Sequence, residues 1–150
     1  MSEAILDLTN TPAPGEKCAP MDAQLEKLKF DMNGLIPVIV QDHANDQVLM
    51  MAYMNREAIE RTMTTGKVHT YSRSRGRLAL KGETSGHFQL VKSVLTDCDR
   101  DVLLVKVEQI VAACHEGYRS CFFRQHEPGA DDWKTIAEKA FEPERVYNKK

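Results

Sequence analysis

The residue types best suited to metal chemistry lie together between Thr96 and Arg124. In the segment DCDRD, carboxylates occupy alternate positions at Asp97, Asp99 and Asp101. Alternate side chains of an extended segment share one face, so these carboxylates would lie side by side, opposite the cysteine between them. Neighbouring carboxylates repel one another unless a cation lies among them, and oxygen ligands suit Mg²⁺ or Ca²⁺. The spacing therefore predicts a hard-cation site on one face of a strand.

Three cysteines of the same segment, Cys98, Cys114 and Cys121, could bind a softer cation. Six residues separate the last two, so the short cysteine spacing of zinc fingers is absent. Three thiolates without a nearby fourth leave one tetrahedral position open, as in catalytic zinc sites where water occupies it. His115 could be the fourth ligand or a general base. The spacing also allows the alternative of ordinary buried thiols beside a solvated acidic turn.

A second polar region combines clustered Arg and Lys side chains with the glycine-punctuated loop KGETSGH. Guanidinium groups, hydroxyls and exposed backbone amides together can bind phosphate. A basic surface hairpin is the alternative interpretation. Two nearby histidines, His69 and His87, could contact a substrate or have a structural role. The candidate substrate ligands are Arg73, Arg75, Lys81, Gly82, Thr84, Ser85, His69 and His87.

The elements that must position these residues are mostly strands. The apolar run Val102–Val107 predicts a buried strand, and Phe30–Gln41 with Val48–Tyr53 predicts a hairpin around the turn Asp42–Gln47. Pro37 suggests an edge position or a bend in the first of these strands. Further strands are expected over Lys67–Ser72 and His87–Thr96. One central helix is expected over Arg56–Thr64, with Asn55 as its N-cap and Gly66 as its stop.

The two ends of the chain differ from this middle. Residues 1–22 contain prolines and show no hydrophobic periodicity, which predicts a mobile arm that includes Cys18. A short helix is predicted over Met21–Phe30. A single domain should then span residues 23–150. It should include a C-terminal helix at about 132–141, which Pro143 ends before a charged tail. We therefore expect an α+β fold of mostly antiparallel strands with a central and a C-terminal helix.

Composition narrows the class of protein. The 150 residues are 42% hydrophobic and 28% charged, which is typical of a soluble globular domain. A formal net charge of −2 argues against general binding to nucleic acid or to membrane surfaces. No segment has the length and apolar character of a membrane span or the pattern of a signal peptide. We therefore expect a cytoplasmic protein whose four cysteines stay reduced.

The motifs GLIPVIVQD, SRSR, KGETSGH, DCDRD and ACHEGYRSCFFR, in this order, resemble the phosphoribosyl-AMP cyclohydrolase family of histidine biosynthesis. The resemblance implies a homodimer that hydrolyses the N1–C6 bond of 1-(5-phosphoribosyl)-AMP, a small nucleotide. It implies zinc bound by Cys98, Cys114 and Cys121 across the dimer, and Mg²⁺ bound by Asp97, Asp99 and Asp101. His115 is the first candidate for the proton shuttle. The resemblance also implies that the homodimer is intertwined, and the short tail leads us to expect a monofunctional protein.

Two other functions would require sequence features that differ from these motifs. A zinc-dependent nucleobase deaminase would need H-x-E and P-C-x-x-C segments, and the sequence contains neither. A non-enzymatic module held together by zinc would need a closed set of four ligands and no arginine-rich or GETSG loop. Both remain alternatives that metal content measured together with activity would separate.

Overall fold

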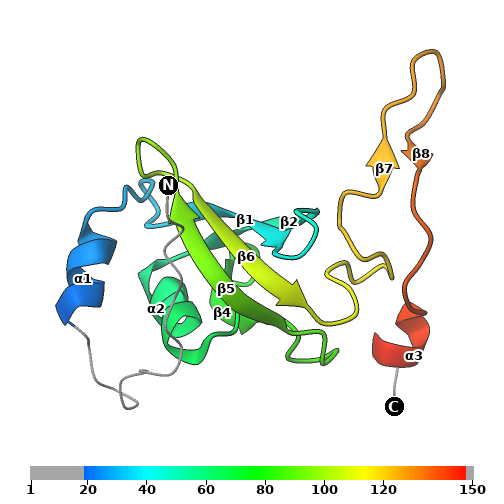
Figure 1. Ribbon diagram of the computed structural model, residues 1–150. Coiled ribbons are helices and arrows are strands. Elements are labelled where there is room, and N and C mark those ends of the chain that lie inside the picture. Colours follow the sequence, from blue (N-terminus) through cyan, green and yellow to red (C-terminus); the bar gives the residue numbers. More distant parts are fainter. Residues whose placement is uncertain (1–18, 148–150) are drawn as a thin grey trace.

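A computed structural model of the protein describes residues 19–147. It is an α+β fold whose largest element is a four-stranded sheet in the order β2-β1-β6-β5 (Figure 1). Two small two-stranded sheets, β3-β4 and β7-β8, accompany it. The elements are α1 (Ala19–Glu26), β1 (Ile36–Asp42), β2 (Val48–Met54), α2 (Arg56–Thr65), β3 (His69–Ser72), β4 (Arg77–Leu80), β5 (Gln89–Thr96), β6 (Leu103–Gln109), β7 (Arg124–Gln125), β8 (Lys134–Thr135) and α3 (Pro143–Tyr147).

The main sheet consists of two antiparallel hairpins joined side by side. Strands β1 and β2 form one hairpin, which the sequence predicts, and β5 and β6 form the other, which it does not predict. Their junction is a parallel pairing of β1 with β6, which begins with Val38 opposite Leu103. Side chains along both inner strands alternate between buried and more exposed positions. The buried set, including Val40, Val105 and Val107, forms the core beneath α2.

Helix α2 has the boundaries that the sequence predicts, to within one residue. The Asn55 side chain accepts a hydrogen bond from the backbone N–H of Ala58 at 2.8 Å, which caps the first turn. Gly66 ends the helix at φ 74°, and its N–H donates to the Thr62 carbonyl. Ala58, Ile59 and Thr62 are buried, so the helix presents one face to the sheet.

The prediction that Pro37 marks an edge strand is wrong, because β1 lies inside the sheet. Pro37 faces Tyr53 of β2, whereas pairing with β6 starts only at Val38. The ring therefore stands just before the parallel ladder, where its missing N–H removes no bond to β6.

The helix predicted at about 132–141 is also wrong. Residues 134 and 135 form β8, which pairs with β7, and the C-terminal helix is instead the short α3 that starts at Pro143. Proline is favoured at the first position of a helix, so it opens α3 and does not end a preceding one. Trp133 and Ile136 are 59% and 53% exposed, because no surface covers the apolar stripe that the spacing suggested. The β7–β8 hairpin projects from the body (Figure 1).

At the other end, α1 begins at Ala19 and ends at Glu26, so the predicted helix is present but starts and ends earlier. Its first residues fall inside the predicted arm, whereas residues 1–18, including Cys18, lie outside the described residues. Asp22 of α1 forms an ion pair with Arg56 of α2 at 3.0 Å, and Leu25 is buried in the core. These contacts attach α1 to the domain.

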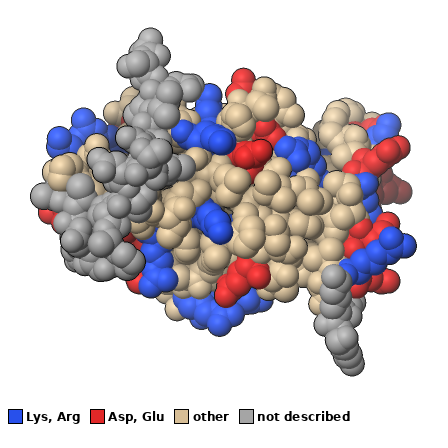
Figure 2. Space-filling view, turned by 60° about the horizontal axis from the view of Figure 1, so that its bottom comes forward, with Lys and Arg blue, Asp and Glu red and all other residues tan. Residues whose placement is uncertain are grey.

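The described surface mixes charges of both signs. On the face shown in Figure 2, basic and acidic side chains are interspersed around a broad uncharged area. No described helix has the length and apolar character that crossing a membrane would require.

The core predicts a contrast between two identical substitutions. We expect Ile59→Ala, at a fully buried position of α2, to lower the free energy of unfolding by about 2–5 kcal/mol because it leaves a cavity. Ile136→Ala, at an exposed position, should change it by less than about 0.5 kcal/mol. Urea denaturation followed by circular dichroism measures both, and equal effects would contradict the described packing.

Candidate functional site

The carboxylates of Asp97, Asp99 and Asp101 converge in the connection between β5 and β6. Their oxygen atoms lie within 4.8 Å of one another, and all three residues are exposed. They do not lie on an extended strand, so the predicted geometry is wrong although the predicted cluster is present. The connection is a turn in which Arg100 has φ 62° and the Asp101 N–H donates to Asp97 Oδ1 at 3.0 Å. The turn, and not strand alternation, brings the side chains together.

The electrostatics of this acidic cluster show how strongly its members interact. Hydrogen bonds from Asp101 to Asp99 and Asp97, together with their charges, raise the pKa of Asp101 to about 6. Desolvation opposes ionisation of Asp97, but hydrogen bonds from Asp99 and from the Asp101 backbone outweigh it and lower its pKa. The cluster therefore holds a proton more tightly than a single aspartate would. A divalent cation could take the place of that proton.

Cys114 and Cys121 lie close enough for the charge of one thiolate to act on the other thiol. Cys114 is buried, whereas the Cys121 residue is partly exposed at the surface. Burial of the thiol is the main reason that the pKa of Cys121 rises to about 11, and the charge of Cys114 adds to the rise. The Cys121 thiol therefore needs a nearby cation to ionise near neutral pH, which makes the pair fitting ligands for a soft metal ion.

The loop that carries these cysteines, residues 114–121, is fixed to the sheet at several points. Arg119 forms an ion pair with the buried Asp42 at the end of β1. Ser120 Oγ donates to the Val48 carbonyl at 2.7 Å, and the Cys121 N–H donates to the Leu49 carbonyl at 2.7 Å. Burial alone would raise the pKa of Asp42, but hydrogen bonds from the Ala44 N–H and from Arg119 keep it below the ordinary value. Asp42 is therefore ionised, and strand β2 carries the cysteine loop.

The partly buried Lys81 lies close enough to both cysteines to interact with their charges, and the buried His87 lies close to Lys81. Lys81 Nζ donates to the Ala113 carbonyl at 2.7 Å, and burial lowers its pKa while the two thiols act in the opposite direction. Burial, and then the charge of Lys81, lowers the pKa of His87, so its ring is neutral near pH 7. The His87 Nδ1 atom is buried and has no hydrogen-bond partner among the described residues.

Cys98, the third predicted zinc ligand, lies apart from the other two. It belongs to the exposed β5–β6 turn, whereas Cys114 follows the opposite end of β6. The seven residues of β6 alone separate these ends by roughly 20 Å at about 3.3 Å per residue. Within the described part of one chain, the three cysteines therefore do not form a common ligand group.

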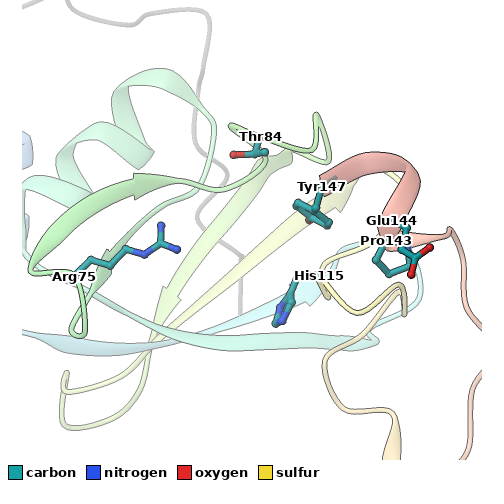
Figure 3. A pocket seen from close by; sticks show the side chains of 6 residues that line it. All are labelled: Arg75, Thr84, His115, Pro143, Glu144 and Tyr147. Atoms are coloured by element: carbon teal, nitrogen blue, oxygen red, sulfur yellow. The ribbon is translucent and has the colours of Figure 1, made fainter. Parts of the chain in front are cut away.

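Next to the cysteine loop lies a cavity of about 540 Å³. Arg75, Thr84 and His115 line it from the body, and the guanidinium of Arg75 points toward the space between Thr84 and His115 (Figure 3). Three residues of α3 complete its lining: Pro143, Glu144 and Tyr147. The exposed His115 thus directly follows Cys114 in the sequence and lies beside a space that a ligand could enter.

The remaining predicted residues surround this region without entering the cavity lining. Arg73 lies over the Tyr53 ring at 4.1 Å, and Ser85 Oγ accepts a hydrogen bond from the His87 N–H. Gly82 has φ +93°, and a Cβ there would lie 2.7 Å from the Phe88 nitrogen, so the loop requires glycine. The buried His69 donates through Nδ1 to the Lys67 carbonyl at 2.8 Å, which is a structural contact.

Sequence reasoning missed two parts of this site. One is the ion pair of Asp42 with Arg119, whose partners are 77 positions apart and have no local signal. The other is the α3 lining, because the tail was expected to be only a charged end. The aromatic residues Phe141 and Tyr147 on either side of Pro143 were the available signal that this tail packs against something.

Comparison with known proteins identifies relatives of this chain. The family model described as phosphoribosyl-AMP cyclohydrolase matches residues 50–123. A phosphoribosyl-AMP cyclohydrolase of Pelotomaculum thermopropionicum is 56% identical over 131 residues, which cover 87% of this chain and all of that protein. One of Methanoregula boonei is 57% identical, covering 81% of this chain and 95% of that protein.

A longer relative is also similar. The histidine biosynthesis bifunctional protein HisIE of Thermoanaerobacter pseudethanolicus is 54% identical over 127 residues, or 85% of this chain. This chain spans only 58% of the length of that bifunctional protein.

The acidic cluster predicts a cation effect on stability. Because the pKa of Asp101 is raised from 3.8 to about 6, its ionisation destabilises the metal-free fold as the pH rises through that window. We expect Mg²⁺ to raise the melting temperature more at pH 7.5 than at pH 5, and Asp99→Asn to reduce that rise. Differential scanning fluorimetry measures both effects. The exposed Glu108→Gln is the control, and an undiminished Mg²⁺ response in Asp99→Asn would exclude the site.

Proposed function

Because this chain belongs to the phosphoribosyl-AMP cyclohydrolase family of histidine biosynthesis, we propose that it opens the adenine ring of 1-(5-phosphoribosyl)-AMP at the N1–C6 bond. The product would be the formimino-carboxamide ribonucleotide. The observation that carries this proposal is the pair of thiols, Cys114 and Cys121, beside a nucleotide-sized cavity that contains His115 and Arg75.

The ligands proposed for zinc are Cys114, Cys121 and Cys98. The two thiols support this assignment because burial, and then the charge of Cys114, raise the pKa of Cys121, so its thiolate form needs a nearby cation. Cys98 would come from a second copy, since it lies at the far end of the β5–β6 hairpin in its own chain. Bound zinc would supply a coordinated water with a pKa lowered to about 7. The nearby Lys81 ammonium would further favour the thiolate forms.

The proposed reaction adds water at C6 of the purine and then breaks the N1–C6 bond. The water oxygen stays on C6 as the new carboxamide oxygen, and a proton must reach N1 as it departs. His115 lines the cavity next to Cys114, and it is exposed enough to exchange protons. We therefore assign it the proton transfer from the adding water to N1. The buried His87 is a weaker candidate, because its ring packs against Phe141 and is not part of the cavity lining.

The substrate phosphates would bind on the Arg75 side of the cavity. The Arg75 guanidinium and the Thr84 hydroxyl face this space, and a guanidinium can donate two parallel hydrogen bonds to phosphate. Arg73 and the Gly82–Gly86 loop lie close enough in the chain to extend this surface toward the second phosphate. The acidic cluster of Asp97, Asp99 and Asp101 is the proposed Mg²⁺ site.

Turnover is the direct test of this function. The zinc-loaded full chain, supplied with Mg²⁺, is incubated with phosphoribosyl-AMP, and the ring-opened product is followed by its absorbance. Steady formation of that product supports the proposal. A folded, zinc-replete dimer without turnover would overturn it and favour a non-enzymatic zinc protein.

A first mutational prediction concerns the proton transfer. We expect His115→Ala to retain zinc and to lower kcat by about 10²–10⁴-fold, which is the usual range for a lost general acid or base. His126→Ala, a matched histidine on the projecting β7–β8 hairpin, should leave kcat unchanged. Stopped-flow kinetics with zinc analysis measures both. Loss of zinc from His115→Ala would make His115 a ligand and place the proton shuttle elsewhere.

A second prediction tests whether two copies share each site. Cys98→Ser and Cys114→Ser should each be inactive alone, because each removes one ligand from every site. In a mixed dimer, one of the two sites regains all three cysteines. Random mixing of the two variants should therefore restore about a quarter of wild-type activity in a two-fold symmetric dimer. No recovery after subunit exchange, verified by mass spectrometry, would contradict a shared site.

A further inference from the structure

The C-terminal segment Lys139–Tyr147 packs directly on the cysteine loop. The backbone N–H groups of Ala140 and Phe141 donate to the Gly117 carbonyl at 2.7 and 3.3 Å. Gly117 has φ +106°, and a Cβ at this position would lie 2.7 Å from the Phe141 carbonyl oxygen. The approach is therefore possible only with glycine at this point of the loop. Because Gly117 lies between Cys114 and Cys121 in the sequence, the segment is attached to the middle of the cysteine loop.

A series of rings continues from this attachment toward the cavity. The buried His87 ring meets Phe141 edge-to-face, with ring centroids 4.7 Å apart. The centroids of Phe141 and Tyr147 are 6.3 Å apart. Phe141 is thus held between a fixed imidazole and the end of α3. Tyr147 is 39% exposed, so part of its ring remains free to contact a ligand.

The cavity of about 540 Å³ consequently has two chemically different walls. The body contributes a guanidinium, a hydroxyl and an imidazole, whereas the C-terminal segment contributes the rings of Pro143 and Tyr147 and the carboxylate of Glu144 (Figure 3). The volume falls within the range of about 300–1,000 Å³ that small-molecule sites occupy. The proposed substrate has both kinds of group, because its flat purine ring carries a ribose phosphate on either side.

We propose that Tyr147 stacks on the purine ring of the substrate and that the C-terminal segment is therefore a specificity-determining wall of the nucleotide site. This inference rests on the proposed function and adds the base-binding residue. Aromatic side chains stack on nucleobases because every base offers a π face. If Arg75 binds one substrate phosphate and Tyr147 stacks on the purine ring, that ring would lie beside His115. The wall lies outside residues 50–123, the range that the family model matches.

The test compares three variants of the zinc-loaded full chain. Tyr147→Ala should raise KM for phosphoribosyl-AMP about 10-fold, as expected for loss of one stacked base, with kcat changed by less than about 2-fold. Tyr147→Phe keeps the ring and should behave as wild type. Trp133→Ala removes an exposed aromatic residue elsewhere and is the matched control. Binding of 5′-AMP, measured by calorimetry, should weaken only in Tyr147→Ala.

The outcomes separate this inference from the proposed function. If wild type turns over but Tyr147→Ala retains its KM and its affinity for 5′-AMP, the stacking role is wrong and the function stands. A fall in kcat with unchanged KM and affinity would also overturn the stacking role. If wild type does not turn over, the proposed function fails, and selective loss of 5′-AMP binding in Tyr147→Ala would still support a base-binding wall.

Discussion

The attachment of the cysteine loop to the central sheet is the interaction on which the rest of the site depends. Arg119 reaches from the loop to the buried carboxylate of Asp42, and backbone carbonyls of β2 hold the next two residues. A loop without these anchors would be free to separate its thiols, because their charges repel each other. The sheet thus fixes the positions of Cys114 and Cys121, and through Gly117 it also fixes the C-terminal wall of the cavity.

This fold contains two clusters of acidic groups whose charged forms repel one another. Three carboxylates meet in the β5–β6 turn, and two thiols meet in the loop beyond β6. The raised pKa of Asp101 expresses the cost of that proximity, and burial together with the charge of Cys114 raises the pKa of Cys121. Backbone hydrogen bonds within the turn and anchors under the loop maintain both arrangements. Each is therefore preorganised for a cation, with donor atoms whose hardness differs.

Local signals in the sequence were sufficient for the β1–β2 hairpin, for α2 with its caps and for the three members of the acidic cluster. They failed where distant parts decide the outcome. Positive φ at Arg100 turns the acidic segment, which strand alternation could not reveal. Residues 132–141 carry a helical apolar spacing, yet the fold offers no surface for it and uses the backbone of Ala140 to reach Gly117. Only tertiary structure shows that Cys98 is remote from Cys114.

The parallel contact between β1 and β6 has a consequence for how the chain reaches its native state. It joins residues about 65 positions apart, such as Val38 and Leu103, whereas each hairpin needs only neighbouring segments. Contacts of such long sequence separation slow folding, because the intervening chain must be ordered first. The two hairpins should therefore form early and dock late. The loop anchored on both β1 and β2 would be completed last, so the metal binding that we propose for its cysteines would report the end of folding.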